Sequence, residues 1–257
     1  MNQPTFSGKW TESSLFVEPG AKPITQRQLN LYYYYLFIQK ILNRIAARKV
    51  LEIGCGRGTM ALYLTKYLGF DLTLLDKVPE AIQLAQENFN QFGLKAEFVV
   101  GDALATGLPA GSFDAIVSIG LAEHFSPAEV ARLLAEQYRL LRPGGVMISL
   151  NIPKKFSIQS LNSINKALRF DSKRPDYFRN DLSAEKFAAL AENAGFSEVK
   201  ITHVCPFPIW VPVSPRADRW ITSLRRIHLW FRRHLMRYPY QTNFLVAQAH
   251  FLVGEKK

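Results

Sequence analysis

The feature that most constrains this sequence is a short apolar run at 50–53 followed at once by three glycines at alternate positions, Gly54, Gly56 and Gly58. The run is typical of a strand buried within a parallel sheet. Apolar residues at helical spacing resume from Met60. A strand, a glycine turn and a helix in this order bring bare backbone against a ligand and direct a helix N-terminus at it. We therefore expect an α/β protein with a ligand at this turn.

Acidic residues stand at the ends of three successive predicted strands. Glu52 lies in the first, Asp76 ends the second at 71–76, and Asp102 follows the third at 96–100. Asp76 lies about 20 residues beyond the glycines, where an acid can accept both hydroxyls of an adenosine ribose. Any one of these acids alone is consistent with a solvated turn. Three of them at this spacing favour a nucleoside-containing ligand.

The E-x-G-x-G-x-G spacing from Glu52 to Gly58 resembles the first motif of the class I S-adenosylmethionine (SAM)-dependent methyltransferases. Dinucleotide-binding proteins have G-x-G-x-x-G instead, so a dehydrogenase is disfavoured. Leu108-Pro109 and the L-R-P-G-G turn at 141–145 are similar to the same family. The resemblance covers residues 45–150 and, more loosely, 181–205 and 244–254. It is strongest to the type 11 branch, which includes quinone-biosynthesis enzymes. A glycine turn that only lets a helix pack on a strand is the alternative.

The resemblance implies a Rossmann-like α/β fold with a seven-stranded, mostly parallel sheet, an antiparallel last strand and helices on both faces. The expected strands are 50–53, 71–76, 96–100, 112–118, 146–150, 199–204 and 244–253. Besides the helix after the turn, the expected helices are 25–48, 79–92, 126–141 and 181–194, and Ser126 and Glu129 predict a capping box. We expect one domain over 1–257, with an N-terminal cap at 1–48 and a basic amphipathic insertion at 206–243.

The resemblance also implies the cofactor, SAM, and the residues that hold it. Residues for its methionine part would be Glu52, Gly54, Gly56 and Gly58. Asp76 would hold the ribose, and Asp102 with the Ala103 backbone would hold the adenine. Ser118 and Leu121 would line the sulfonium side. The predicted cofactor set is completed by their neighbours Cys55, Lys77 and Gly101. We expect no metal site.

The candidate catalytic residues, Glu123 and His124, follow the fourth predicted strand. In the family this loop borders the methyl group, and E-H-F at this place is also similar to the cyclopropane-fatty-acid synthases. A histidine can act as a general base near neutral pH. A base is needed only if the acceptor must lose a proton, and a lone histidine is often structural. Both interpretations remain open.

Basic residues concentrate in the insertion. The chain has a formal net charge of +11, and residues 206–243 hold seven arginines and one aspartate, a net +6. In a helix over 216–237 one face would present Trp220, Leu224, Ile227, Phe231 and Leu235. Such a basic amphipathic helix is typical of anionic membrane surfaces or partner proteins. The alternative is that this face packs on its own domain.

The acceptor is expected to be a small molecule, lipophilic or aromatic. No N/D-P-P-Y/F sequence follows the fourth predicted strand, which disfavours amino methylation of nucleic-acid bases. Nucleic acid is disfavoured as a partner without being excluded. The competing functions are an RNA or protein methyltransferase that uses the arginine-rich helix, and a non-catalytic SAM-binding or membrane-associated interaction protein. The sequence does not indicate an oligomeric state.

The sequence favours a cytoplasmic protein, with peripheral attachment to a membrane as an option. Its two cysteines, Cys55 and Cys205, are too few for a disulfide framework. No apolar run approaches the roughly 18 residues of a membrane span. The run Tyr32–Tyr35 has two interpretations, a helix packed on the core and an aromatic lid over a substrate.

Overall fold

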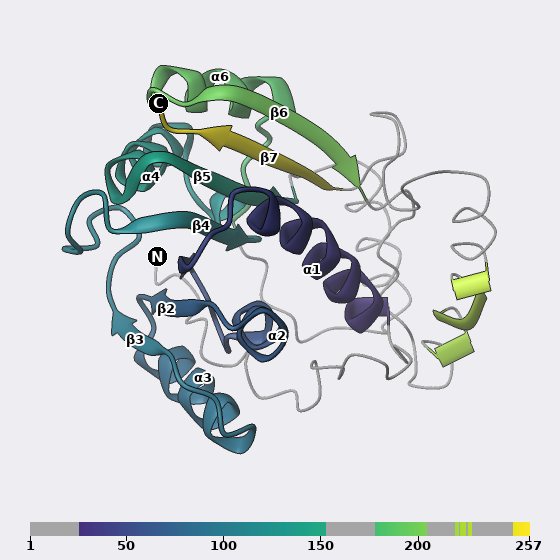
Figure 1. Ribbon diagram of the computed structural model, residues 1–257. Helices are drawn as coiled ribbons and strands as arrows, with labels where there is room; N and C mark the ends of the chain where they lie inside the picture. Colours follow the sequence, from purple (N-terminus) through teal and green to yellow (C-terminus); the bar gives the residue numbers. More distant parts are fainter. Residues whose placement is uncertain (1–25, 153–177, 205–218, 221, 225, 228–248) are drawn as a thin grey trace.

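The computed structural model describes residues 26–152, 178–204, 219–220, 222–224, 226–227 and 249–257. A seven-stranded sheet has the order β3-β2-β1-β4-β5-β7-β6 (Figure 1). Its strands are β1 (Lys49–Ile53), β2 (Asp71–Asp76), β3 (Glu97–Val100), β4 (Phe113–Ile119), β5 (Leu141–Asn151), β6 (Ser197–Val204) and β7 (Ala249–Glu255). Strands β1 to β5 pair in parallel, and β7 is antiparallel to both of its neighbours. The predicted fold class is confirmed.

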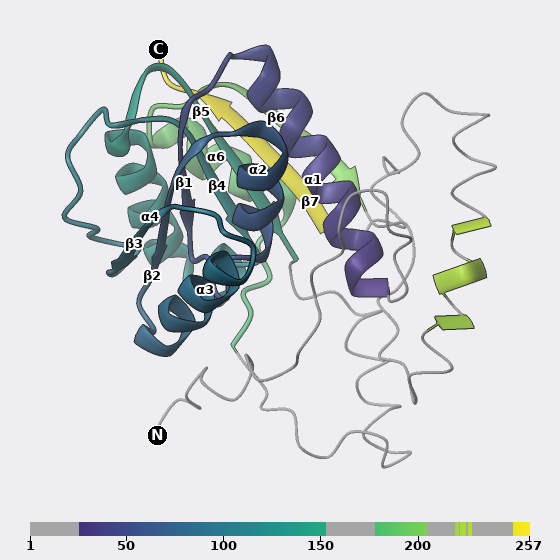
Figure 2. The same ribbon diagram turned by 60° about the horizontal axis from the view of Figure 1, so that its bottom comes forward.

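Helices cover both faces of the sheet (Figure 2). One face is covered by α1 (Gln26–Arg44), α2 (Thr59–Leu68) and α3 (Pro79–Gln91), and the other by α4 (Pro127–Leu140) and α6 (Ala184–Asn193). Val50 of β1 packs in the first core, and its neighbour Leu51 packs in the second. Successive side chains of a strand point to opposite faces, so a strand between two helix layers is apolar at nearly every position.

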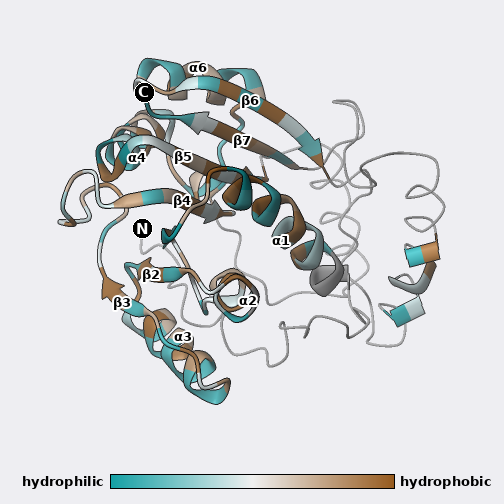
Figure 3. Ribbon diagram, viewed as in Figure 1, coloured by the Kyte–Doolittle hydropathy of each residue, from teal (hydrophilic) through white to brown (hydrophobic). Residues whose placement is uncertain are grey.

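The helices are amphipathic, as the hydropathy colours of α1 and α3 in Figure 3 show. The capping box at the start of α4 is present as predicted. Ser126 Oγ accepts from Glu129 N at 3.4 Å, and Glu129 Oε2 accepts from Ser126 N at 2.8 Å. These reciprocal bonds satisfy two backbone donors that a helix start would otherwise leave without partners.

Several strand ends differ from the sequence prediction by one or two residues, and the start of β5 differs by five. Helix α1 ends at Arg44 instead of residue 48, and α6 begins at Ala184 instead of residue 181. β5 begins at Leu141 instead of residue 146, because Leu141 already pairs with Phe113 before the ladder shifts register. β7 continues to Glu255, two residues beyond the predicted end, because Glu255 pairs with Val146. The predicted start of this strand, 244–248, lies outside the described residues. Pairing with neighbouring strands thus overrides the local pattern of the sequence at these two positions.

The tyrosine run of α1 contributes to the core. Tyr34 and Tyr35 are buried. Tyr35 stacks on Tyr63 of α2 with ring centroids 5.3 Å apart, and Tyr34 makes an edge contact with Phe251 of β7 at 5.6 Å. This arrangement agrees with the core-packing interpretation of the run. Tyr32 and Tyr33 are half-buried and pack against the same core.

Candidate cofactor site and active-site loop

The glycine turn lies between the end of β1 and the start of α2. Gly54, Gly56 and Gly58 have φ angles of 70°, 53° and 69°, which glycine adopts without steric cost. A Cβ added to Gly54 would lie 2.7 Å from Leu121 Cδ1, and one added to Gly58 would lie 2.8 Å from Leu74 Cδ2. The turn therefore needs glycine at these positions, both for its conformation and for the close approach of its neighbours.

Asp76 connects the glycine turn with the end of β3. Its Oδ2 accepts from Gly56 N at 2.9 Å, and its Oδ1 accepts from Val78 N at 3.0 Å. Its backbone oxygen accepts from Gly101 N at 3.0 Å. A carboxylate has about four acceptor positions, so Asp76 can still accept the hydroxyls of a ribose. Lys77, the next residue, is exposed.

Glu52 is buried, with 3% of its surface exposed. Its Oε2 accepts from Ala61 N at 2.8 Å, so it caps the first turn of α2. Burial raises the pKa of Glu52 to about 8; the bond from Ala61 opposes this rise, and the charge of Asp76 adds to it. Burial, with these two carboxylates, also raises the pKa of the Cys55 thiol. Cys55 is therefore a packed residue of low reactivity.

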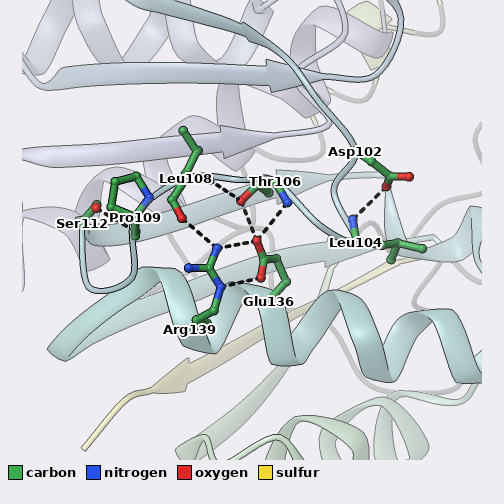
Figure 4. Close-up of polar contacts among 8 residues, drawn as sticks. All are labelled: Asp102, Leu104, Thr106, Leu108, Pro109, Ser112, Glu136 and Arg139. Atoms are coloured by element: carbon green, nitrogen blue, oxygen red, sulfur yellow. Dashed lines mark hydrogen bonds and ion pairs between the residues drawn. The ribbon is translucent and has the colours of Figure 1, made fainter.

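The loop after β3 presents Asp102 at the same edge of the sheet. Asp102 is exposed, and its Oδ1 accepts from Leu104 N at 2.9 Å (Figure 4). Ala103 beside it is buried, and Gly101 before it lies against Leu75 of β2. The second oxygen, Oδ2, accepts no hydrogen bond from the part of the chain that the structure describes. It remains available to a donor such as an amino group.

This loop is hydrogen-bonded to an ion pair on α4, between Glu136 and Arg139 (Figure 4). Glu136 Oε1 accepts from Thr106 N at 3.0 Å and from Thr106 Oγ1 at 2.6 Å. Arg139 Nη2 donates to Glu136 Oε1 at 2.7 Å and to Leu108 O at 2.8 Å. The Arg139 guanidinium, with smaller contributions from Thr106, lowers the pKa of Glu136 to about 2. The loop therefore has a fixed path over α4.

Ser118 and Leu121 lie at the end of β4 and have different surroundings. Ser118 is buried, and its Oγ donates to Ser149 Oγ of β5 at 3.0 Å. Ser118 therefore links two central strands through its side chain. Leu121 is half-buried, and its side chain lies against Gly54. Leu121 thus brings the loop after β4 onto the glycine turn.

Glu123 and His124 lie in a short 3₁₀ turn, η2 (Ala122–His124). Glu123 is buried, with its Oε1 close to Gly120. His124 is half-buried, and its Nδ1 lies 2.8 Å from the backbone oxygen of Phe178. A carbonyl oxygen only accepts, so Nδ1 must carry the hydrogen. In the neutral ring Nε2 is then the nitrogen with the lone pair, which is the form that a general base requires.

The structure brings the predicted residues of β1, β2, β3 and β4 to one edge of the sheet. This edge holds the carboxyl ends of parallel strands, where α/β proteins bind ligands. Residues 50–145 match a family model described as a methyltransferase domain. The matched residues include the glycine turn, Asp76 and Asp102. Residues 50–145 belong to the class I SAM-dependent methyltransferase family.

The chain and its curated relatives match only over part of their lengths. It is 34% identical over 153 residues to a phthiotriol/phenolphthiotriol dimycocerosates methyltransferase of Mycobacterium leprae, covering 58% of this chain and 53% of that protein. It is 33% identical over 109 residues to a demethylmenaquinone methyltransferase of Thermus thermophilus, covering 42% and 49%. The chain thus spans about half the length of these curated relatives.

Solved structures agree on the fold. A putative sarcosine dimethylglycine methyltransferase from Galdieria sulphuraria matches with a TM-score of 0.61 at 18% identity, over 98% of this chain and 96% of the other. At this identity the likeness concerns the fold alone. It extends the fold assignment beyond the residues matched by the family model.

The site fits SAM, the cofactor of this family. Asp76 and Asp102 retain acceptor positions for hydroxyl and amino groups. Burial disfavours the charged form of Glu52 beside the turn, and the cationic sulfonium or amine of SAM would counter the resulting rise of its pKa. Among the described residues, no helix is long and apolar enough to cross a membrane.

Sequence reasoning missed three polar residues that hold the site in shape. Asn88 of α3 donates from Nδ2 to Arg57 O of the glycine turn at 2.9 Å. Glu136 holds the loop after β3, and Asn180 bonds the turn with His124. Each partner lies 30 or more positions away in the sequence. No local spacing rule could have identified these contacts.

Proposed function

We propose that this protein transfers a methyl group from SAM to a small, lipophilic or aromatic acceptor, with His124 as the base that removes a proton from the acceptor. The observation that supports the base is the hydrogen bond from His124 Nδ1 to Phe178 O at 2.8 Å. The acceptor class is inferred from the relatives, whose names specify dimycocerosates and demethylmenaquinone. Both are lipophilic molecules.

The cofactor supplies an electrophilic methyl group on a sulfonium, which a nucleophile displaces in line. The chain has to hold both reactants and exclude water. In our proposal the backbone from Gly54 to Gly58 and the acid Glu52 hold the methionine part. Asp76 accepts the ribose hydroxyls, Asp102 accepts the adenine amino group, and Leu121 lines the methyl side.

His124 would act on the acceptor through Nε2. An acceptor hydroxyl becomes a strong nucleophile only as its proton leaves, and Nε2 is the ring nitrogen that can take it. The Phe178 carbonyl stabilises the resulting imidazolium, because Nδ1–H donates to it more strongly when the ring is charged. Glu123 is buried under the turn. We therefore assign it to the shape of the loop and give the proton transfer to His124.

A peripheral membrane site would suit such an acceptor. In the described part of 216–237, Trp220, Leu224 and Ile227 are exposed, Trp220 by 67%. Their spacing of four and three residues places them on one helix face. Because this face is open to solvent there, packing on the chain's own core is not supported. We propose that 206–243 is an insertion within one methyltransferase domain over 1–257, and that its basic helix contacts an anionic membrane surface.

The experiment is turnover with SAM on a panel of lipid-soluble phenols and hydroquinones. His124→Ala is expected to lower kcat by about 10²-fold or more, because the base is lost. SAM affinity measured by calorimetry should stay unchanged, because in our proposal His124 contacts the acceptor and not SAM. His203→Ala, on the edge strand β6, serves as the control histidine and should leave kcat unchanged.

A second variant separates the base from its hydrogen bond. The side-chain Nδ2 of an asparagine can take the place of His124 Nδ1 and donate to Phe178 O, but it has no basic nitrogen. His124→Asn should therefore be as inactive as His124→Ala while keeping the stability of the wild type. Full turnover in His124→Asn would reject the base and leave His124 with a structural role.

A further inference from the structure

The turn with Glu123 and His124 is bonded to a distant segment, residues 178–182. His124 Nδ1 donates to Phe178 O at 2.8 Å, and Asn180 N donates to Glu123 O at 2.7 Å. The side chain of Asn180 makes two more bonds. Its Nδ2 donates to Ala122 O at 2.8 Å and to Phe125 O at 2.9 Å. Four hydrogen bonds thus join the two segments.

Asn180 is the centre of this contact. It is buried, with 5% of its surface exposed. Ala122 O and Phe125 O can only accept, so the amide nitrogen of Asn180 must face them and both of its hydrogens are used. Its Oδ1 accepts from Leu182 N at 3.3 Å, which fixes the side chain on its own segment. Every polar group of this side chain therefore has an assigned partner.

The turn has few hydrogen bonds of its own. η2 has three residues, and its own bonds are His124 N to Leu121 O at 3.1 Å and Phe125 N to Ala122 O at 3.3 Å. Hydrogen bonds of 3₁₀ turns have poor geometry, so an isolated single turn is weak. The Asn180 amide donates to the carbonyls at both ends of this turn, Ala122 and Phe125. It therefore fixes where the ring of His124 lies.

The same segment is tied to the end of β5. Arg179 Nη1 donates to Ile152 O at 3.3 Å. Ile152 is the residue before 153–177, and Phe178 is the residue after it. The two ends of this stretch are therefore bonded beside the turn that holds His124.

We propose that Asn180 is a positioning residue that sets the orientation and tautomer of His124. It does so by bonding the turn at Ala122 and Phe125 so that His124 Nδ1 meets Phe178 O. The catalytic part of this inference rests on the proposed function, in which His124 is the base. The structural part, the tautomer, can be tested without an acceptor.

The test uses ¹⁵N NMR of the histidine rings at pH 8, with the His124 signals assigned from the His124→Ala spectrum. The wild type is expected to show His124 with its hydrogen on Nδ1. Asn180→Ala and the isosteric Asn180→Asp, which cannot donate to two carbonyls, should shift His124 to a mixture of tautomers. In both variants kcat should fall about 10-fold or more with SAM affinity unchanged.

The matched control is Ser183→Ala. Ser183 Oγ accepts from Lys186 N at 3.3 Å and caps α6, three residues beyond Asn180. Its loss lowers the melting temperature but leaves the His124 turn untouched. At an equal loss of melting temperature, only the Asn180 variants should change the ring spectrum and kcat.

The outcomes separate the two proposals. A wild-type His124 with its hydrogen on Nε2, or ring spectra unchanged in both Asn180 variants, overturns the positioning role. If His124 no longer carries its hydrogen on Nδ1 in the Asn180 variants, Asn180 sets the tautomer of His124. This result holds even if no acceptor on the panel is methylated. A His124→Asn enzyme with full turnover would reject the base while leaving the tautomer result intact.

Discussion

At the residue scale, Asp76 has structural roles in addition to its proposed role as a ligand of the ribose. Its two carboxylate oxygens already bond Gly56 N and Val78 N, and its backbone oxygen bonds Gly101 N. Asp76 therefore holds the glycine turn and the loop after β3 in fixed positions relative to each other before any ligand is present. Hydrogen bonds to charged acceptors contribute about 1.5–3 kcal/mol each, so one residue can affect both the shape of the site and the affinity of its ligand.

Replacing Asp76 tests this residue directly. Asp76→Ala is expected to weaken SAM binding by about 10²-fold, because the two charged hydrogen bonds that we propose to the ribose would be lost together with the support of the turn. Calorimetric titration with SAM and with its demethylated product measures the change. Asp71→Ala, at the opposite end of β2 and exposed, is the matched control and should bind normally. Equal affinity in Asp76→Ala and the wild type would refute the assignment.

At the element scale, the loop after β3 depends on α4. Glu136 accepts from both the backbone and the hydroxyl of Thr106, and Arg139 donates to Leu108 O. A connection of this kind replaces the regular hydrogen bonds of a strand or helix with side-chain bonds. The loop with Asp102 is therefore only as rigid as the Glu136–Arg139 pair on the helix beside it.

This dependence predicts a pH effect. The pKa of Glu136 is lowered to about 2, mainly by the hydrogen bond from Arg139. A group with a lowered pKa stabilises the fold fully above its ordinary value near 4.5, and this contribution is lost as the pH falls from there toward 2. Glu136→Gln should therefore lower the free energy of unfolding by about 1 kcal/mol at pH 7, with partial exposure of Arg139 limiting the effect.

Urea unfolding at several pH values measures the difference between Glu136→Gln and the wild type. The difference should shrink as the pH falls from 4.5 toward 2, because the unfolded wild-type chain then binds a proton at Glu136 that the folded protein does not bind. Glu80→Gln, in the first turn of α3, provides a comparison away from the loop. A difference that stays constant with pH would show that the ion pair does not stabilise the loop.

At the scale of the whole molecule, charge is unevenly distributed. Of the formal net charge of +11, +6 comes from residues 206–243. In the same stretch the described side chains of Trp220, Leu224 and Ile227 are exposed. Exposed apolar residues next to arginines are suited to a membrane surface, which has anionic headgroups over an apolar interior. The acceptor of our proposal would be found in such a surface.

Binding to vesicles tests this arrangement. The wild type is expected to sediment with phosphatidylglycerol vesicles and much less with phosphatidylcholine vesicles. Trp220→Ala/Ile227→Ala should weaken this binding about 10-fold or more, because burial of each large apolar side chain contributes roughly 1.5–3 kcal/mol. Leu36→Ala, an exposed apolar residue of α1, is the control. RNA binding with a steep salt dependence and no vesicle binding would favour the nucleic-acid alternative.

The sequence by itself determined the sheet and the edge that binds the cofactor. The apolar runs before Gly54, Asp76 and Asp102 can be recognised from adjacent residues alone. Strand periodicity and the steric freedom of glycine are both local properties of the chain. The capping box at Ser126 and Glu129 is local for the same reason, and it was confirmed. Strand β2 was predicted to the residue, because a polar residue bounds its apolar run on each side.

Only the tertiary structure decided what surrounds each predicted residue. Glu52 caps α2, Ser118 bonds β5, and Asn180 holds the turn with His124 from 58 positions away. These bonds join elements that are separate in the sequence, and a buried polar group takes whichever partner the packed elements bring within reach. Residue types and spacing define which strand ends meet, whereas the packing of the helices on the sheet defines which donor faces which acceptor.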